Sequence, residues 1–112
     1  MSRVTRALVA ASDAEDGWAL VHLLGSHAIR GYTAKEAELA CNIVLNSATD
    51  YVHSRNMEAA LMDCMLDAIS FWTEEPVVLA AALGALANLC YCTKLQAGGS
   101  EIRIVSSVPP KW

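Results

Sequence analysis

Four cysteines and three histidines are the residues of this chain best suited to bind a metal ion or to act as a nucleophile or base. A zinc site usually combines a Cys-x2–4-Cys pair with a second pair of matching spacing. Cys90 and Cys92 are too close in sequence for this pattern, and on a helix they would point about 200° apart. No serine or cysteine lies in a glycine-flanked turn of the kind that exposes a nucleophile. The sequence therefore predicts no metal, no cofactor and no catalytic residue.

Two carboxylates form the clearest acidic pair. Asp63 and Asp67 are four residues apart, so they are neighbours on one face of a helix. A solvated helix face explains such a pair, and a docking surface for a basic partner is the alternative. We therefore take Asp63 and Asp67 as candidate partner-binding residues. A di-metal carboxylate bundle would need Glu-x-x-His pairs on facing helices, and the sequence contains none.

Asn88 is the only strongly polar side chain from Val77 to Cys92, an apolar segment that we expect to form most of a helix at about residues 76–97. Pro76 suits the first position of a helix. A helix that is apolar all round must be surrounded on most sides, so we expect this one at the centre of the fold. Gly84 in its interior costs about 1 kcal/mol relative to alanine and indicates close approach of another helix. Asn88 needs a hydrogen-bond partner, either within the domain or on a bound ligand, and is a candidate binding residue.

Capping patterns and apolar spacing predict the other helices. Both Ser12-Asp13-Ala14-Glu15 and Thr33-Ala34-Lys35-Glu36 match a capping box. The pattern of residues 3–11 fits either a helix or a strand. In the helix after the first box, we expect Trp18 to point inward. Over residues 57–72 the apolar side chains form the clearest single stripe, namely Met57, Leu61, Cys64, Met65, Ala68 and Trp72.

Residues 100–112 differ from the rest in being dense in β-branched side chains, which favours an extended strand. Such a strand could pair with residues 3–9, pair with another chain, or remain a disordered tail. We therefore divide the chain into a helical domain, 1–99, and an extended tail, 100–112, that can add a strand. The candidate partner contacts in this tail are Ile102, Ile104, Val105 and Trp112.

The overall composition narrows the class of function. Hydrophobic residues make up 54% and charged residues 18% of the chain, which indicates either a tightly packed core or an apolar face for a partner. A net charge of −4 disfavours nucleic-acid binding. The apolar segment from Val77 to Cys92 is interrupted by Asn88 and has 16 residues, fewer than the about 20 of a membrane span. Cysteines inside helical segments indicate reduced thiols, and hence a cytoplasmic protein.

Residues 57–93 resemble a single armadillo/HEAT-type helical unit. The resemblance rests on Ala82-Leu83-Gly84-Ala85-Leu86-Ala87-Asn88-Leu89-Cys90, preceded by a helix and the connection Thr73-Glu74-Glu75-Pro76. In armadillo repeats the asparagine of this helix lines a groove and bonds an extended peptide. The resemblance therefore implies such a role for Asn88.

Together these observations predict an all-α bundle of four to five helices with a central apolar helix and an extended C-terminal tail. We expect a non-enzymatic protein–protein interaction module, such as a small adaptor, inhibitor or regulatory subunit. Its partner would be a larger protein or a second copy of the chain. The main alternative is a small-molecule-binding or enzymatic domain with a pocket between helices, lined by Trp18, His22, Cys41 and His53. A DNA-binding regulator is a further alternative, although its recognition helix, 33–54, would be acidic.

Overall fold

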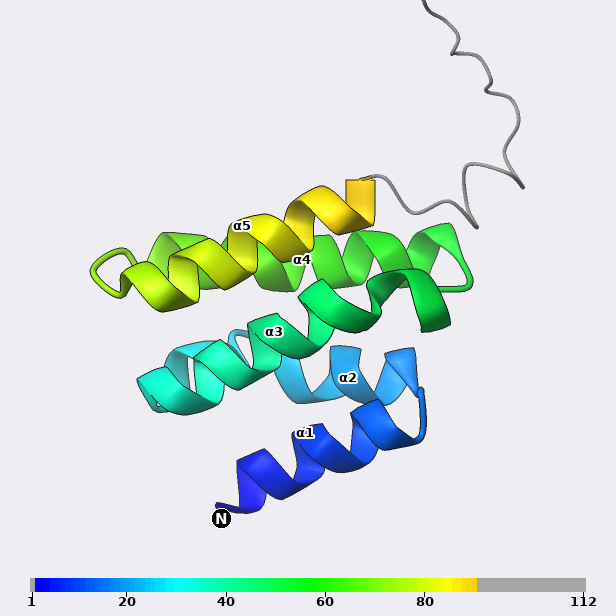
Figure 1. Ribbon diagram of the computed structural model, residues 1–112, viewed down its shortest axis with the longest axis horizontal. Helices are drawn as coiled ribbons and strands as arrows, with labels where there is room; N and C mark the ends of the chain where they lie inside the picture. The colour runs from blue at the N-terminus through cyan, green and yellow to red at the C-terminus, as the bar shows by residue number, and fades with distance from the viewer. Residues whose placement is uncertain (1, 91–112) are drawn as a thin grey trace, which may run out of the picture.

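The computed structural model describes residues 2–90, apart from the side chains of residues 48, 49 and 51 (Figure 1). Within this range the chain is helical and contains no strand, so residues 3–11 are helix and the predicted all-α class is confirmed. The elements in order are α1 (Arg3–Asp13), α2 (Gly17–Leu24), the 3-10 helix η1 (Ala28–Gly31), α3 (Ala34–Tyr51), α4 (Arg55–Phe71) and α5 (Pro76–Cys90). None of the described helices has the length and apolar character needed to cross a membrane.

One of the two predicted capping boxes forms. At the start of α3, the Thr33 amide donates to Glu36 Oε1 at 2.8 Å, and the Glu36 amide donates to Thr33 Oγ1 at 3.1 Å. The capping box predicted at Ser12 does not form, because Ser12 lies inside α1. Glu15 adopts a left-handed φ of 53°, which turns the chain after α1. Asp16 then caps α2 by accepting from the Ala19 amide at 3.0 Å.

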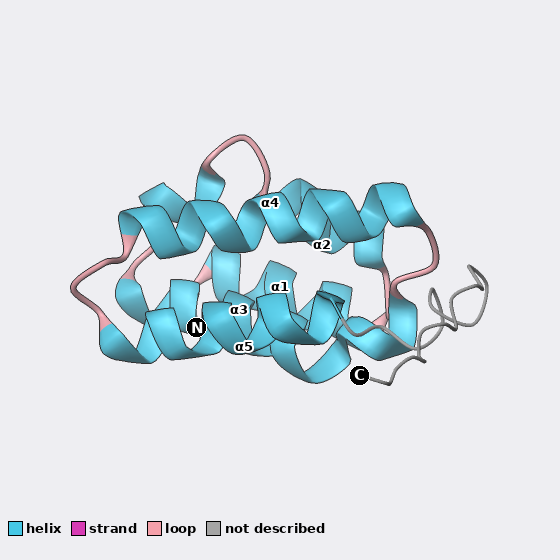
Figure 2. Ribbon diagram, turned by 90° about the horizontal axis from the view of Figure 1, so that it is seen from above, coloured by secondary structure: helices cyan, strands magenta, loops and turns pink. Residues whose placement is uncertain are grey.

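The helices form two layers, and consecutive helices alternate between them. Figure 2 shows α1, α3 and α5 in one layer and α2 and α4 in the other. Within the first layer α3 lies between α1 and α5 and contacts both. The last described helix, α5, contacts α3 beside it and α4 in the other layer. The middle helix of its layer is therefore α3.

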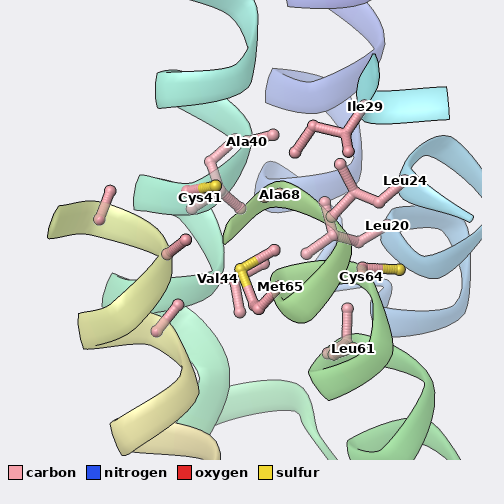
Figure 3. Packing of buried hydrophobic residues seen from close by; sticks show 14 of the residues in the cluster. Leu20, Leu24, Ile29, Ala40, Cys41, Val44, Leu61, Cys64, Met65 and Ala68 are labelled. Atoms are coloured by element: carbon pink, nitrogen blue, oxygen red, sulfur yellow. The ribbon is translucent and has the colours of Figure 1, made fainter. Parts of the chain in front are cut away.

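The core lies between the layers. Figure 3 shows Met65 of α4 beside Val44 of α3, with Leu20 and Leu24 of α2 close by. The stripe predicted for α4 is confirmed, with Trp72 partly buried at its end and the rest buried. A prediction that fails is the inward orientation of Trp18, which is 51% exposed. Leu20 and Leu24 face the core instead, and residues two apart on a helix point in opposite directions.

Helix α5 is buried on one face and exposed on the other. The buried face carries Val78, Ala81, Ala82, Ala85 and Leu89. On the opposite face Val77 is 56% and Leu83 54% exposed, so α5 is not covered all round as its composition predicts. The difference arises because a helix apolar on every side gives no sequence signal for which side is covered.

The predicted close approach at Gly84 is confirmed. A Cβ atom at this position would lie 2.9 Å from Leu45 Cδ1 of α3. The absence of a side chain therefore lets α3 and α5 pack closely.

Candidate functional site

An open groove runs between α1 and α2, with a volume of about 650 Å³. Its α1 side consists of alanines, and its α2 side carries larger side chains. The lining residues are Ala7, Ala10, Ala11, Ala14, Asp16, Trp18, Ala19, His22 and Leu23.

The alanines are spaced so that they form one continuous shelf. Ala7, Ala10, Ala11 and Ala14 follow one another at intervals of three, one and three residues, which places them on one side of α1. Because their side chains are short, a bound side chain can approach the α1 backbone closely. The half-exposed indole of Trp18 supplies a large apolar wall opposite this shelf.

Exposed charged residues lie on α1 and on the turn beside the groove. Asp13, Glu15 and Asp16 are exposed around the turn that joins α1 to α2. Arg6 is also exposed. Among the lining residues Asp16 is the one acidic side chain and none is Lys or Arg, so the groove itself is mainly apolar. The turn beside it is acidic, and Arg6 lies on α1 one turn before Ala10.

A second cluster of polar side chains joins η1 to α4. Asp67 Oδ1 accepts hydrogen bonds from Arg30 Nε at 2.9 Å and Arg30 Nη2 at 2.5 Å, and lies 3.1 Å from His27 Nδ1. The Asp67 side chain is only 11% exposed. Burial raises the pKa of Asp67, but the hydrogen bonds from Arg30 and then His27 outweigh it and hold the pKa below its usual value.

This polar cluster borders a smaller cavity of about 310 Å³, which also contacts Cys64. A carboxylate that orients a histidine is a feature of general-base sites. Here, however, the carboxylate is also paired with Arg30, and burial raises the pKa of the Cys64 thiol to about 11. Cys64 is therefore a protonated thiol at neutral pH and a poor nucleophile. The arrangement best fits an anchor that fixes η1 on α4.

The two carboxylates predicted as a docking strip both border the smaller cavity, but their surroundings differ. Asp63 is exposed on α4, as a solvated helix face requires. Asp67 is instead held inward by Arg30 and His27, because η1 packs beside α4 at this point. Its Oδ2 atom is buried and has no hydrogen-bond partner among the described residues.

Asn88 finds its hydrogen-bond partner within the domain. The Asn88 Nδ2 group of α5 donates to the Leu45 carbonyl of α3 at 2.5 Å. This donor bond adds to the close contact at Gly84 and ties the two helices together. A peptide-binding role for Asn88 stays a prediction. The remaining candidates, Ile102, Ile104, Val105 and Trp112, lie outside the described residues.

The four residues of the alternative pocket do not form one site. Trp18 and His22 come together in the α1–α2 groove. Cys41 is buried in the core, where burial raises its pKa to about 12, and His53 is exposed between α3 and α4. Sequence reasoning missed Ala7, Ala10 and Ala14, although their helical spacing was visible in the chain.

The described residues contain no group of three His, Cys, Asp or Glu side chains placed to hold a metal ion. Helix α3, the recognition helix of the DNA-binding alternative, lies between α1 and α5 and does not project from the fold. Comparison of the chain with protein-family models, curated proteins and solved structures finds no match. The function is therefore inferred from the surface of the molecule.

Proposed function

We propose that this protein is a protein–protein interaction module, an adaptor, inhibitor or regulatory subunit, that binds an amphipathic helix of a larger protein. The binding site is the groove between α1 and α2. The observation that carries the proposal is the open apolar groove with an alanine shelf and an exposed tryptophan wall. An exposed Trp18 beside a contiguous apolar surface is typical of an interaction site.

The shape of the groove favours a helix as its occupant. Residues 7 to 14 cover two helical turns, or about 10 Å along the α1 axis. Helices that bind in grooves present apolar anchors at positions i, i+3, i+4 and i+7, which span the same two turns. Large side chains of such a helix would fill the space above the alanine shelf and contact Trp18.

The charges beside the groove give the bound helix a preferred direction. Basic residues of the partner would lie near Asp13, Glu15 and Asp16, and acidic residues near Arg6. Complementary charges of this kind mainly increase the association rate and fix the orientation. We therefore expect binding to weaken with salt, while the apolar contacts supply most of the affinity.

The test is a selection of amphipathic helical peptides displayed on phage against the full chain, followed by fluorescence anisotropy with the selected peptides. We expect peptides with a leucine stripe and basic residues at one end. Ala10→Trp, which fills the groove, should weaken their binding at least about tenfold. The matched control is Ala59→Trp on α4, an exposed alanine outside the groove, and it should bind as the wild type does. Selected peptides that bind A10W as tightly as the wild type would contradict the proposal.

A small-molecule site is the second candidate, and a specific observation favours it. Trp18 and His22 line the same groove, and its volume falls within the range of about 300–1,000 Å³ typical of ligand pockets. A flat aromatic ligand could stack on the Trp18 indole and bond the His22 imidazole. A thermal-shift screen of aromatic fragments against the wild type, A10W and A59W tests this candidate. Fragments that stabilise the wild type and A59W but not A10W would support it.

A further inference from the structure

We propose that the exposed face of α5 is a self-association surface, through which two copies of this chain pack antiparallel. The surface is formed by four residues, Val77, Ala80, Leu83 and Ala87, called the α5 stripe below. It lies on a different helix from the α1–α2 groove, so this inference does not depend on the proposed function.

The α5 stripe is a continuous apolar surface. Its residues follow one another at intervals of three, three and four, so they lie on one side of the helix. All four are exposed, and the two large ones are more than half exposed. No acidic or basic residue occurs from Pro76 to Leu89, and the amide donor of Asn88 is bonded to Leu45. Water therefore meets an apolar helix face along the whole stripe.

The position of α5 leaves this face available. Figure 1 shows α5 at one edge of the layer formed by α1, α3 and α5. Its contacts within the described residues are mainly to α3 on one side and α4 behind it. An apolar helix at the edge of a layer can be covered by another helix laid against it.

The order of large and small residues makes the stripe complementary to itself. Along the helix the order is large, small, large, small. When a second copy runs antiparallel, Val77 lies opposite Ala87 of the other copy, and Ala80 lies opposite Leu83. Each large side chain then meets a small one, and the two-fold axis passes near residue 82. Such an arrangement is isologous, as in most homodimers.

Electrostatics favour the same orientation. Because the stripe carries no charge, two copies can meet without desolvating an ion or placing like charges together. In an antiparallel pair, the positive end of each helix dipole lies beside the negative end of the other. A parallel pair would place like ends together and Val77 against Val77. The antiparallel pair is therefore the one that the chain favours.

The size of the surface sets the expected strength. One pair of short helices buries less than the roughly 1,200 Å² at the lower limit of standard interfaces. We therefore expect a weak, concentration-dependent dimer, with a Kd on the order of micromolar or above.

Sedimentation equilibrium of the full chain, from low micromolar to millimolar concentration, tests the proposal. The wild type should pass from monomer to dimer over this range. Leu83→Lys and Ala80→Glu should each raise the dimer Kd at least about tenfold, because each places an unpaired charge in the apolar contact. An equimolar mixture of L83K and A80E should form a heterodimer, since Lys at one position then faces Glu of the other copy.

This mixture distinguishes specific pairing from unfolding or general aggregation, and circular dichroism checks that both variants fold. A wild type that stays monomeric would overturn the proposal, including the case in which residues 91–112 cover the stripe. A dimer unaffected by L83K, or a mixture that fails to associate, would also overturn it. Peptide binding by L83K reports separately on the α1–α2 groove and should match that of the wild type.

Discussion

At the residue scale, the carboxylate of Asp67 holds the short helix η1 against α4. The carboxylate accepts hydrogen bonds from the Arg30 guanidinium and contacts the His27 imidazole. Both side chains belong to a segment 37 to 40 residues earlier in the chain. His27 and Ser26 both have positive φ values, 64° and 53°, which are rare for residues other than glycine. Trp72 Nε1 also donates to the Ile29 carbonyl at 3.1 Å. Together these bonds fix a strained turn that would otherwise be free to relax.

Replacing Asp67 should therefore destabilise the fold. Asp67→Asn keeps the shape of the side chain but removes the charge that pairs with Arg30. We expect a loss of about 1–3 kcal/mol in the free energy of unfolding, measured by urea denaturation, because charge-assisted hydrogen bonds are lost at a mostly buried site. The exposed neighbour supplies the control, since Asp63→Asn should change stability by less than about 0.5 kcal/mol. Equal effects of the two substitutions would rule out the anchoring role.

The same carboxylate should make stability depend on acid pH. The pKa of Asp67 is lowered in the folded state, so the folded protein binds fewer protons than the unfolded chain near that pKa. The stabilisation is present above the unfolded value of about 3.9 and is lost as the pH falls through the lower folded value. Between pH 7 and pH 3, the urea midpoint of D67N should fall less than that of the wild type. Parallel curves for the two proteins would contradict this linkage.

Two core thiols should resist modification in the folded protein. Burial, followed by the nearby Cys64, raises the pKa of Cys41 to about 12, and burial raises that of Cys64 to about 11. Because the thiolate is the reactive form, alkylation at pH 8 should be slow at both sites until urea unfolds the chain. Peptide mapping by mass spectrometry after iodoacetamide treatment measures each site separately. Rapid labelling of Cys64 without urea would show that the cavity beside it opens.

At the element scale, the contact between α3 and α5 depends on the absence of a side chain at Gly84. Leu45 already lies within 3 Å of the position that a Cβ would take, and the Asn88 bond to the Leu45 carbonyl spans the same interface. The small residues of α5 thus bring two helix backbones close enough for an asparagine to reach the neighbouring main chain. This arrangement explains why a polar residue sits in an otherwise apolar helix.

Gly84→Leu should disrupt this interface. The added side chain would push α5 away from α3 and break the Asn88 bond, so we expect a loss of about 2 kcal/mol or more despite the better helix propensity of leucine. Thermal unfolding by circular dichroism measures the effect, at a protein concentration low enough to avoid self-association. Ala59→Leu on the exposed side of α4 is the matched control and should be nearly neutral. A G84L variant as stable as the wild type would mean that the interface adapts without cost.

At the scale of the whole molecule, two apolar surfaces lie on different helices of the fold. The α1–α2 groove is concave and marked by charges, which suits a partner helix of complementary charge. The α5 stripe is uncharged and self-complementary, which suits a second copy. Partner contact by Ile102, Ile104, Val105 and Trp112 remains a proposal, because these residues lie outside the described range.

Deletion of residues 100–112 tests whether this tail contributes to folding, to partner binding or to neither. If residues 100–112 serve binding alone, the shortened chain should unfold at the same urea midpoint as the full chain. If the tail contributes to partner contact, affinity for a selected partner peptide or for a second copy should fall while the midpoint stays constant. A lower midpoint would instead show that the tail contributes to the core. If both the urea midpoint and the affinity stay unchanged, the proposed partner contact by the tail residues is wrong.

Local signals in the sequence were sufficient to predict most of the helices. The Thr33 box and the stripe from Met57 to Ala68 depend on residues three or four apart, which are neighbours in any helix that forms. The proline at the start of α5 acts alone, because its fixed φ suits the first helical position. The close contact at Gly84 was also predictable, because a glycine inside a helix implies a neighbour. By itself, the sequence thus determined the all-α class, the starts of α3 and α5, the approximate extent of α4 and the apolar character of α5.

The tertiary structure decided which faces are covered and which residues meet. Leu20 and Leu24, rather than Trp18, face the core, and this choice created the α1–α2 groove. Asp67 pairs with Arg30, which is 37 residues earlier in the chain. One side of the uniformly apolar α5 is exposed. These outcomes depend on contacts between residues far apart in the chain. Such contacts are fixed only when all the helices pack together, because the pattern within a single helix is compatible with several neighbours.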